Sequence, residues 1–308
     1  MPLHRLTTIT LGVPDVDAAV EFYEDFGLET TGDKRLSSAD GGEQLRLVES
    51  SRRRLLEIGV GVDDPDDLDR IASRLEGTGF DWERETTERI AVREPGTNLA
   101  VHIEIAPRLV QTEATAPEMN GPAHSVRPNA RADGAFRTGP VRPRRLGHVV
   151  VGSTDLDGTY GLFVDALGFK ISDEVNGRAR FLRCSTDHHN LLVQAAPVDF
   201  LHHTSWEVDD IDEIGRGATN LLEKDPECHV WGLGRHNIGS NFFWYLRDPA
   251  GNFVEYYSDL DVIVDDELWE PRIFDVVVDG NVAWGPRHPR GFYRPPSEEE
   301  LVGTHARG

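Results

Sequence analysis

Histidines are concentrated in the second half of the chain, where seven of the twelve lie between His148 and His236. His148 and His203 each lie near the start of a run typical of a strand, and Glu255 lies inside the strand-like run 252–257. Two imidazoles and one carboxylate from different strands would occupy one face of an octahedral ion and leave three positions open, an arrangement typical of non-haem Fe(II) sites that react with O2. Each histidine alone could equally be a hydrogen-bonded strand residue, so the prediction depends on the three together.

The spacing around the two histidines supports their convergence. Asp157 lies nine residues after His148, and Asp212 lies nine residues after His203. The two strands therefore take like places in related half-repeats, and we expect their imidazoles to face each other. This spacing favours His203 over the adjacent His202 as the ligand. An ionised carboxylate inside an apolar strand also needs a cation or a hydrogen-bonded partner, for which a metal or an arginine would serve.

The elements that position these residues are visible as an internal repeat. Residues 9–28 and 149–169 each contain a β-branched run, an aspartate suited to cap a helix, an amphipathic segment and a glycine suited to end that helix. Gly12, Asp15 and Asp17 match Gly152, Asp155 and Asp157 at an offset of 140, and Phe22 and Gly27 match Phe163 and Gly168 at 141, after one inserted residue.

Strand-like runs follow in both copies and predict two similar α+β domains. In the second copy a hairpin is expected at the turn 248–251, where proline and glycine favour a type I turn, and the first copy has its counterpart at 94–98. Between the copies, Pro- and Arg-containing sequence without periodicity predicts an extended or disordered connector. We therefore divide the chain into an N-terminal domain (1–108), a connector (109–144), a C-terminal catalytic domain (145–262) and a tail (263–308).

Composition limits the partners that the protein can have. The formal net charge is −22, which would repel nucleic acid and anionic membranes, and no apolar run approaches the roughly 20 residues that span a bilayer. Two cysteines, Cys184 and Cys228, match no disulfide framework, zinc motif or redox motif, and the first residues contain no apolar signal core. We expect a soluble, cytoplasmic protein that acts on a small molecule.

Two stretches carry a family resemblance. The segment Gly232–His236, the segment Ser240–Tyr256 and the strands that begin at His148 and His203 resemble the type I extradiol, or meta-cleaving, catechol dioxygenases of the vicinal oxygen chelate superfamily. The resemblance covers residues 5–262 and is most specific in the second half. It implies an α+β fold with two domains of paired βαβββ modules, as in glyoxalases, and a metal in the C-terminal domain alone.

The resemblance also implies roles for individual residues. By repeat alignment, the first domain has Thr8 in place of His148 and Val101 in place of Glu255, so it would be a structural partner. The family's residues carry over as metal ligands (His148, His203, Glu255), as the acid/base (His189, with His188 as the alternative) and as the groups that hydrogen-bond substrate (His236, Tyr245). We further expect Ile238 and Phe253 on the wall of the substrate pocket.

The implied activity is ring cleavage of a catechol by O2 at Fe(II), with Mn(II) as an alternative metal and a muconic semialdehyde type product. The stretch Asn237–Ser240 departs from the pattern of dioxygenases specialised for dihydroxybiphenyl rings, so biphenyl specificity is not expected. A homo-oligomer is expected, as is common in the family. Two alternatives share the fold: a glyoxalase-like metal lyase or isomerase, and a metal-free aromatic-binding module.

Overall fold

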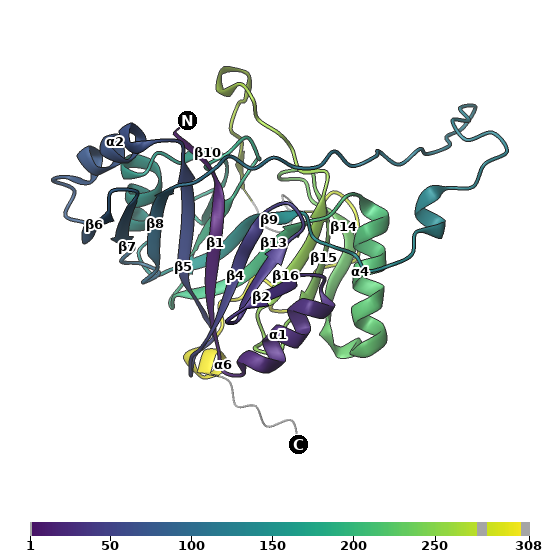
Figure 1. Ribbon diagram of the computed structural model, residues 1–308, viewed down its shortest axis with the longest axis horizontal. Helices are drawn as coiled ribbons and strands as arrows, with labels where there is room; N and C mark the ends of the chain where they lie inside the picture. Colours follow the sequence, from purple (N-terminus) through teal and green to yellow (C-terminus); the bar gives the residue numbers. More distant parts are fainter. Residues whose placement is uncertain (1, 276–281, 303–308) are drawn as a thin grey trace.

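The computed structural model describes residues 2–275 and 282–302, and within them the order βαβββ occurs four times (Figure 1). The N-terminal domain contains β1 (Leu3–Val13), α1 (Val16–Asp25), β2 (Glu29–Gly32), β3 (Arg35–Ser38), β4 (Gly42–Glu49), β5 (Arg54–Val62), α2 (Pro65–Leu75), β6 (Trp82–Thr86), β7 (Arg89–Arg93) and β8 (Ala100–Ile105). The C-terminal domain contains β9 (Arg145–Ser153), α3 (Leu156–Tyr160), η2 (Gly161–Ala166), β10 (Lys170–Val175), β11 (Ala179–Arg183), β12 (Leu191–Ala195), β13 (Phe200–Glu207), α4 (Ile211–Lys224), η3 (Pro226–Cys228), β14 (His229–Arg235), β15 (Phe242–Arg247) and β16 (Phe253–Ser258). The predicted α+β fold of paired βαβββ modules is confirmed.

Each domain forms one mixed sheet. The first sheet has the strand order β2-β3-β4-β1-β5-β8-β7-β6, and the second has β14-β15-β16-β13-β9-β12-β11-β10-β17, in which the short β17 (Ile273–Phe274) adds to one edge. In both sheets the first strands of the two modules pair antiparallel at the centre: β1 with β5 and β9 with β13. The centre of the second sheet therefore contains β16, β13 and β9 side by side.

The inserted residue of the second repeat is accommodated in its first helix. As predicted, Asp15 and Asp155 cap the helices α1 and α3, where their side chains accept hydrogen bonds from the N–H groups of Ala18 and Gly158. α1 then continues to its end as an α-helix, whereas α3 passes into the π-helical turn η2. One extra residue in a helix is commonly absorbed as such a turn. The insertion therefore leaves the strands on either side in place.

The two domains pack directly on each other. The ring of Phe26 at the end of α1 stacks on Tyr256 of β16 with centroids 3.9 Å apart, and the Tyr256 hydroxyl donates to the Phe26 carbonyl at 2.6 Å. A buried apolar cluster continues from the first sheet into the second. The N-terminal domain thus supports the back of the sheet that carries the histidines and Glu255.

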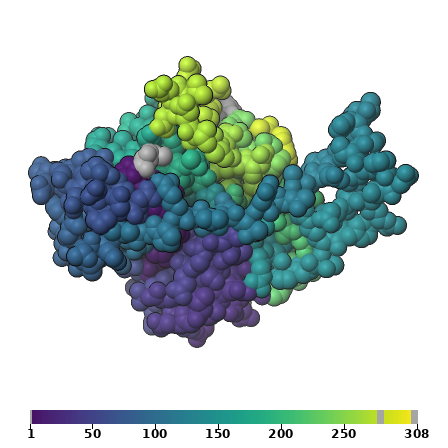
Figure 2. Space-filling view, turned by 45° about the horizontal axis from the view of Figure 1, so that its top comes forward, coloured from purple at the N-terminus to yellow at the C-terminus, as the bar shows by residue number. Residues whose placement is uncertain are grey.

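The segment between the domains runs across the body and then projects away from it (Figures 1 and 2). Its regular structure consists of the single turn η1 (Asp133–Phe136) and a bridge between Gly121 and His124. Arg137 anchors its far end through Asp210 at 2.8 Å. This segment therefore has little regular structure, and its far end contacts the N-terminus of α4.

The tail returns to the C-terminal domain. It contains η4 (Asp266–Leu268), β17 and the short α6 (Glu298–Val302), and Trp284 makes a bridge with Arg235 at the end of β14. No helix in residues 2–275 and 282–302 has the length and apolar character needed to cross a membrane.

Candidate active site

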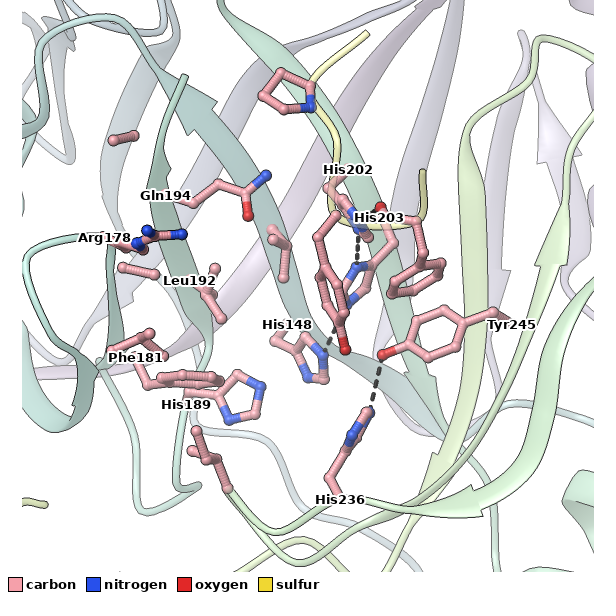
Figure 3. Close-up of a pocket in the computed structure, with 18 of the residues that line it drawn as sticks. His148, Arg178, Phe181, His189, Leu192, Gln194, His202, His203, His236 and Tyr245 are labelled. Atoms are coloured by element: carbon pink, nitrogen blue, oxygen red, sulfur yellow. Dashed lines mark hydrogen bonds between the residues drawn. The ribbon is translucent and has the colours of Figure 1, made fainter. Parts of the chain in front are cut away.

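His148, His203 and Glu255 lie on β9, β13 and β16, and their side chains converge in the interior of the C-terminal domain. Figure 3 shows the two histidines at the cavity. The Nε2 atoms of the two histidines are 3.4 Å apart, and they lie 3.2 and 3.4 Å from Oε2 of Glu255. Neighbouring ligands about 2.1 Å from an octahedral ion are separated by about 3.0 Å. The three atoms are therefore spaced like one face of an octahedron, with a small contraction needed on binding.

The strand register explains why these residues meet. Ser205 of β13 is paired with His148 on one side and with Glu255 on the other, so His148 and Glu255 lie in one row across the sheet with Ser205 between them. His203 lies two residues before Ser205 on the same strand. A β-bulge between Leu201 and His203 inserts one extra residue in β13. Successive strand side chains normally alternate between faces, but a bulge breaks this rule. As a result both His202 and His203 line the same cavity.

The electrostatics of Glu255 fit a bound cation. Its side chain is fully buried, which opposes ionisation, yet the neighbouring His148 and His203 outweigh burial and hold its pKa below the usual value. Oε1 accepts from Asn241 at 3.3 Å, whereas Oε2 has no hydrogen-bond partner in the described part of the chain. A buried carboxylate oxygen without a donor, 3.2 and 3.4 Å from two imidazole nitrogens, is the arrangement that a metal ion would complete.

His189 faces the same space from the loop between β11 and β12. Its ring centroid is 4.2 Å from that of His148, and the ring of Phe181 packs edge-on against it. Burial, with a further contribution from nearby histidines, holds the pKa of His189 well below the usual value. The alternative, His188, turns away from the cavity and contacts Asp173 at 3.0 Å. Only His189 of this pair lines the cavity.

A buried network holds the loop that carries His189. The side-chain oxygen of Asn190 accepts from the N–H groups of Cys184 and Ser185 at 2.9 and 3.1 Å. The guanidinium of Arg145 bonds both carboxylate oxygens of Asp187 at 2.5 and 2.9 Å. Burial opposes ionisation of Asp187, but the pairing with Arg145 lowers its pKa. The loop is therefore fixed by charge as well as by backbone hydrogen bonds.

His236 and Tyr245 approach from the opposite side. His236 follows β14, Tyr245 lies on β15, and the Tyr245 hydroxyl is 3.0 Å from Nε2 of His236. Nε2 of His236 is also 3.8 Å from Oε1 of Glu255. Burial, followed by the nearby Glu255, raises the pKa of Tyr245, so its hydroxyl is a stable hydrogen-bond donor. The structure thus brings five of the predicted polar residues around one space, and the fully buried Glu255 contacts two of them, His148 and His203.

That space is a cavity of about 500 Å³. Ile238 lies on its wall as expected, together with Phe181, Leu192 and Val150. The expectation for Phe253 is wrong. Its ring stacks on Phe292 at 5.2 Å and borders a neighbouring cavity instead, because Phe292 from the tail lies between it and the main cavity.

Several cavity residues were not predicted from the sequence. Part of the wall is formed by the tail residues Phe292, Tyr293 and Pro295. The aromatic residues of the tail were the one sequence feature that could have indicated such a contact. Trp269 packs against His188, whereas Trp284 is 46% exposed. Asn241 lies inside the segment that carries the family resemblance, so its position was available as a signal, but nothing in the residue type alone linked it to Glu255.

The corresponding face of the N-terminal domain differs. Val101, expected in the place of Glu255, lies in the apolar core. The pairing of β8 with β5 sets His102 opposite Gly59, as Glu255 is set opposite Ser205. The counterpart of Glu255 is therefore His102 and not Val101, one residue away from the position that the repeat alignment gave. Because strand side chains alternate, these two side chains lie on opposite faces of the sheet.

The polar groups on that face bond one another. Glu57 accepts from Thr10 at 2.6 Å, Glu104 accepts from Thr7 at 2.5 Å, and His102 Nδ1 accepts from Arg89 at 3.1 Å. Within residues 2–275 and 282–302, the only group of three or more possible metal-binding side chains that meet is that of His148, His203 and Glu255.

Comparisons with known proteins agree with this geometry. Residues 5–99 and 145–256 match the family model described as glyoxalase/bleomycin resistance protein/dioxygenase superfamily. The chain is 30% identical to metapyrocatechase 2 of Cupriavidus necator, over 95% of this chain and 92% of that protein. It is 28% identical to a manganese-dependent 2,3-dihydroxybiphenyl 1,2-dioxygenase of Geobacillus genomosp. 3, over 85% and 87%. A crystal structure of the Mn(II)-bound glyoxalase from Novosphingobium aromaticivorans shares the fold, with a TM-score of 0.77, 24% identity, and coverage of 99% and 98%.

Proposed function

Since the chain belongs to the glyoxalase/bleomycin resistance protein/dioxygenase superfamily, we propose that it is an extradiol dioxygenase, which opens a catechol ring beside its two hydroxyl groups with O2. The expected resemblance and enzyme class are confirmed, because the curated relatives are named as catechol and dihydroxybiphenyl dioxygenases. For the same reason the lyase and the metal-free binding module are not favoured. The observation that carries the proposal is the convergence of His148, His203 and Glu255 at the cavity.

The donor set fits Fe(II), and Mn(II) accepts the same ligands. His148, His203 and Glu255 would hold the ion, and its charge would satisfy the unpartnered Oε2 of Glu255. A bound ferrous ion supplies the electron-transfer chemistry that allows O2 to react with an electron-rich ring. Two neutral imidazoles and one carboxylate leave a net charge of about +1 at the site, which favours an anionic catecholate over a neutral diol.

Side chains of this protein would accept the substrate's proton and hydrogen-bond its oxygens. His189, whose pKa is lowered by burial, is neutral at pH 7 and can accept a proton from a catechol hydroxyl. The Tyr245 hydroxyl and His236 lie across the cavity from it and would hydrogen-bond the second oxygen of the diol. The apolar side chains of Phe181, Leu192 and Ile238 would hold the ring and exclude water.

We further propose that the N-terminal domain (1–108) supports the catalytic domain (145–262) without binding metal, and that the protein is a homo-oligomer. A cytoplasmic location is proposed from the two cysteines, which are both free and buried. The homo-oligomer is inferred from what is common in the family, and the location from the cysteine usage.

Oxygen uptake with a panel of catechols tests the activity. The protein is loaded anaerobically with Fe(II), mixed with catechols from unsubstituted to bicyclic, and exposed to air. We expect stoichiometric O2 consumption and a yellow ring-fission product. Turnover of the methylglyoxal–glutathione adduct with no O2 uptake on any catechol would instead identify a lyase.

A further inference from the structure

Two pairs of adjacent histidines, His188–His189 and His202–His203, share one arrangement. In each pair the two Nδ1 atoms contact each other, at 3.1 Å in the first pair and 2.7 Å in the second. In each pair the first ring also contacts an acceptor through Nε2, and the second ring faces the cavity. All four side chains are buried.

The acceptors at Nε2 determine where the protons are. His188 Nε2 lies 3.0 Å from a carboxylate oxygen of Asp173, and His202 Nε2 lies 2.7 Å from the Phe292 carbonyl. Neither oxygen can donate, so a proton lies on each Nε2, and in the neutral form of the ring Nδ1 then carries a lone pair. The facing Nδ1 of His189 or His203 must then donate.

We propose that His188 and His202 are positioning residues that fix the tautomers of their neighbours. Each keeps the proton of the next histidine on Nδ1 and leaves its Nε2 with a lone pair. For His203 that lone pair points toward Glu255 and His148, where a metal would bind, and for His189 it is free to accept a proton. The roles of the two Nε2 atoms rest on the proposed function, whereas the tautomers themselves do not.

The opposite tautomer is disfavoured by the same contacts. A proton on Nε2 of His203 would place two lone pairs face to face across 2.7 Å, a separation too short for a water molecule to lie between them. The bulge that inserts an extra residue in β13 brings both rings to one side and makes the contact possible. The pairing is therefore a property of the backbone as well as of the two side chains.

The substitution Asp173→Asn tests the first pair without changing its shape. Asp173 Oδ1 accepts from the Arg272 N–H at 2.7 Å, and the asparagine oxygen can keep that bond. Its NH2 group would then face His188 Nε2 and donate, which moves the His188 proton to Nδ1 and the His189 proton to Nε2. Glu174→Gln, which removes the neighbouring carboxylate that pairs with Arg180, is the matched control.

Long-range 1H–15N NMR of the metal-free protein, labelled with 15N-histidine and assigned with His189→Gln, reads the tautomer directly. We expect an Nδ1–H signal for His189 in the parent and in Glu174→Gln, and an Nε2–H signal in Asp173→Asn. Ring cleavage by Fe-loaded Asp173→Asn should fall about 10²-fold, as for a lost base. An unchanged His189 tautomer in Asp173→Asn, or an Nε2–H tautomer in the parent, overturns the proposal even if the enzyme cleaves catechols.

The second pair is tested by metal affinity. His202→Leu removes the acceptor for the His203 N–H, and such a loss typically weakens metal binding by about 10–100-fold. His202→Asn places a carbonyl oxygen near the position of Nδ1 and should restore affinity to within about threefold of the parent. Competition with a chelator for Mn(II) measures both. Equal affinity of the leucine and asparagine variants would show that His202 acts only by packing.

A separate observation concerns the wall of the cavity away from Tyr245. Arg178 and Gln194 line the cavity there (Figure 3). Gln194 Nε2 is buried without a hydrogen-bond partner in the described chain. Arg178 is exposed to solvent and borders the same part of the cavity. A buried amide donor without an acceptor and a solvent-exposed guanidinium therefore lie on one side of the cavity, across from His236 and Tyr245.

We infer that the preferred catechol carries a carboxylate or similar anionic substituent on the side of the ring that faces these donors. A guanidinium and an amide suit such a group, because charge-assisted hydrogen bonds are stronger than neutral ones. This inference rests on the proposed function and narrows its substrate class.

Steady-state oxygen uptake with unsubstituted catechol and with carboxylated catechols tests it. We expect Arg178→Met to lower kcat/KM for the best carboxylated substrate by about 10–100-fold and to leave unsubstituted catechol unchanged. Arg180→Met, which removes the guanidinium that lies over Tyr160, is the control. Equal losses on both substrates, or a parent enzyme that prefers the unsubstituted ring, would refute the anionic subsite while leaving ring cleavage intact.

Discussion

The two domains have the same strand order about their centre, but they treat polar groups on the inner face of the sheet differently. In the N-terminal domain, Glu57, Glu104 and His102 each bond a threonine or an arginine of the same sheet. One ring nitrogen lacks a partner on each face of the described chain, Nε2 of His102 in the first domain and Nδ1 of His148 in the second, but Oε2 of Glu255 is a buried carboxylate oxygen without a donor. Among the described residues, the two faces therefore differ in this one carboxylate oxygen.

This difference has an energetic side. A buried polar atom without a partner costs about 1–3 kcal/mol, so Glu255 gives up stability that Glu57 and Glu104 keep through their threonine donors. A bound cation would recover that stability in the C-terminal domain alone. Changes made at matched positions in the two sheets should therefore have very unequal effects.

The largest effect is expected at the carboxylate of the three-residue group. Glu255→Gln or His148→Ala should abolish metal binding and ring cleavage and leave a folded protein, because two remaining ligands hold an ion poorly. Metal content after gel filtration and O2 uptake measure the loss. Glu57→Gln in the other sheet should keep full metal content and rate. Full activity of iron-loaded Glu255→Gln would disprove the ligand assignment.

Removal of the proposed base should leave the metal in place. His189→Ala is expected to retain Fe(II) and to lower kcat by about 10²-fold or more. The matched change His102→Ala in the N-terminal sheet should leave kcat unchanged. A parent-like rate in His189→Ala would assign proton transfer to another group.

The ion pair between Arg145 and Asp187, which holds the loop of His189, should affect the stability of the protein and the pH dependence of that stability. Arg5 of β1 and Arg145 of β9 lie on equivalent strands, but Arg5 bonds the Pro107 carbonyl, whereas Arg145 pairs with the buried Asp187. Asp187→Asn should lower the free energy of unfolding by about 3 kcal/mol at pH 7, because Arg145 loses a buried partner.

The sign of the pH effect follows from the lowered pKa of Asp187. A carboxyl with a lowered pKa in the folded state stabilises the protein above its unfolded pKa of about 3.9 and loses that contribution as the pH falls below it. Urea unfolding of parent and variant should therefore converge below about pH 4. A difference that stays constant from pH 7 to pH 3 would contradict this origin.

The smallest effect is expected in the N-terminal sheet. Thr10→Val removes the hydroxyl that Glu57 accepts from and should cost about 1 kcal/mol of stability, since Glu57 is partly exposed to water. Metal content and kcat should not change. A loss of activity here would mean that the two sheets are coupled more tightly than their separate hydrogen bonds indicate.

Much of this architecture is predictable from local sequence signals. The aspartate caps, the turn at 248–251 and the single inserted residue are each determined within one turn of chain, and they placed the repeat correctly. The sequence also named the five polar residues that line the cavity, and Glu255, which contacts two of them. Their roles as ligands and acid/base stay predictions.

Other features depend on pairing between distant strands and were not predictable in the same way. The bulge at His202 places two adjacent histidines on one side, so spacing alone could not assign a role to the first. The one-residue register shift that exchanges Val101 for His102 likewise arises from ladder pairing. Phe253 was misplaced because Phe292, nearly forty residues later, occupies the wall in front of it.

The position of Phe292, Tyr293 and Pro295 has a practical consequence for handling the protein. A fragment that ended after β16 would retain every candidate metal ligand and the whole second sheet apart from β17, yet one side of its binding chamber would be missing. Such a fragment could hold iron and still turn over aromatic substrates poorly. Affinity handles are therefore better fused to the N-terminus, and shortened versions should be judged by substrate affinity as well as by metal content.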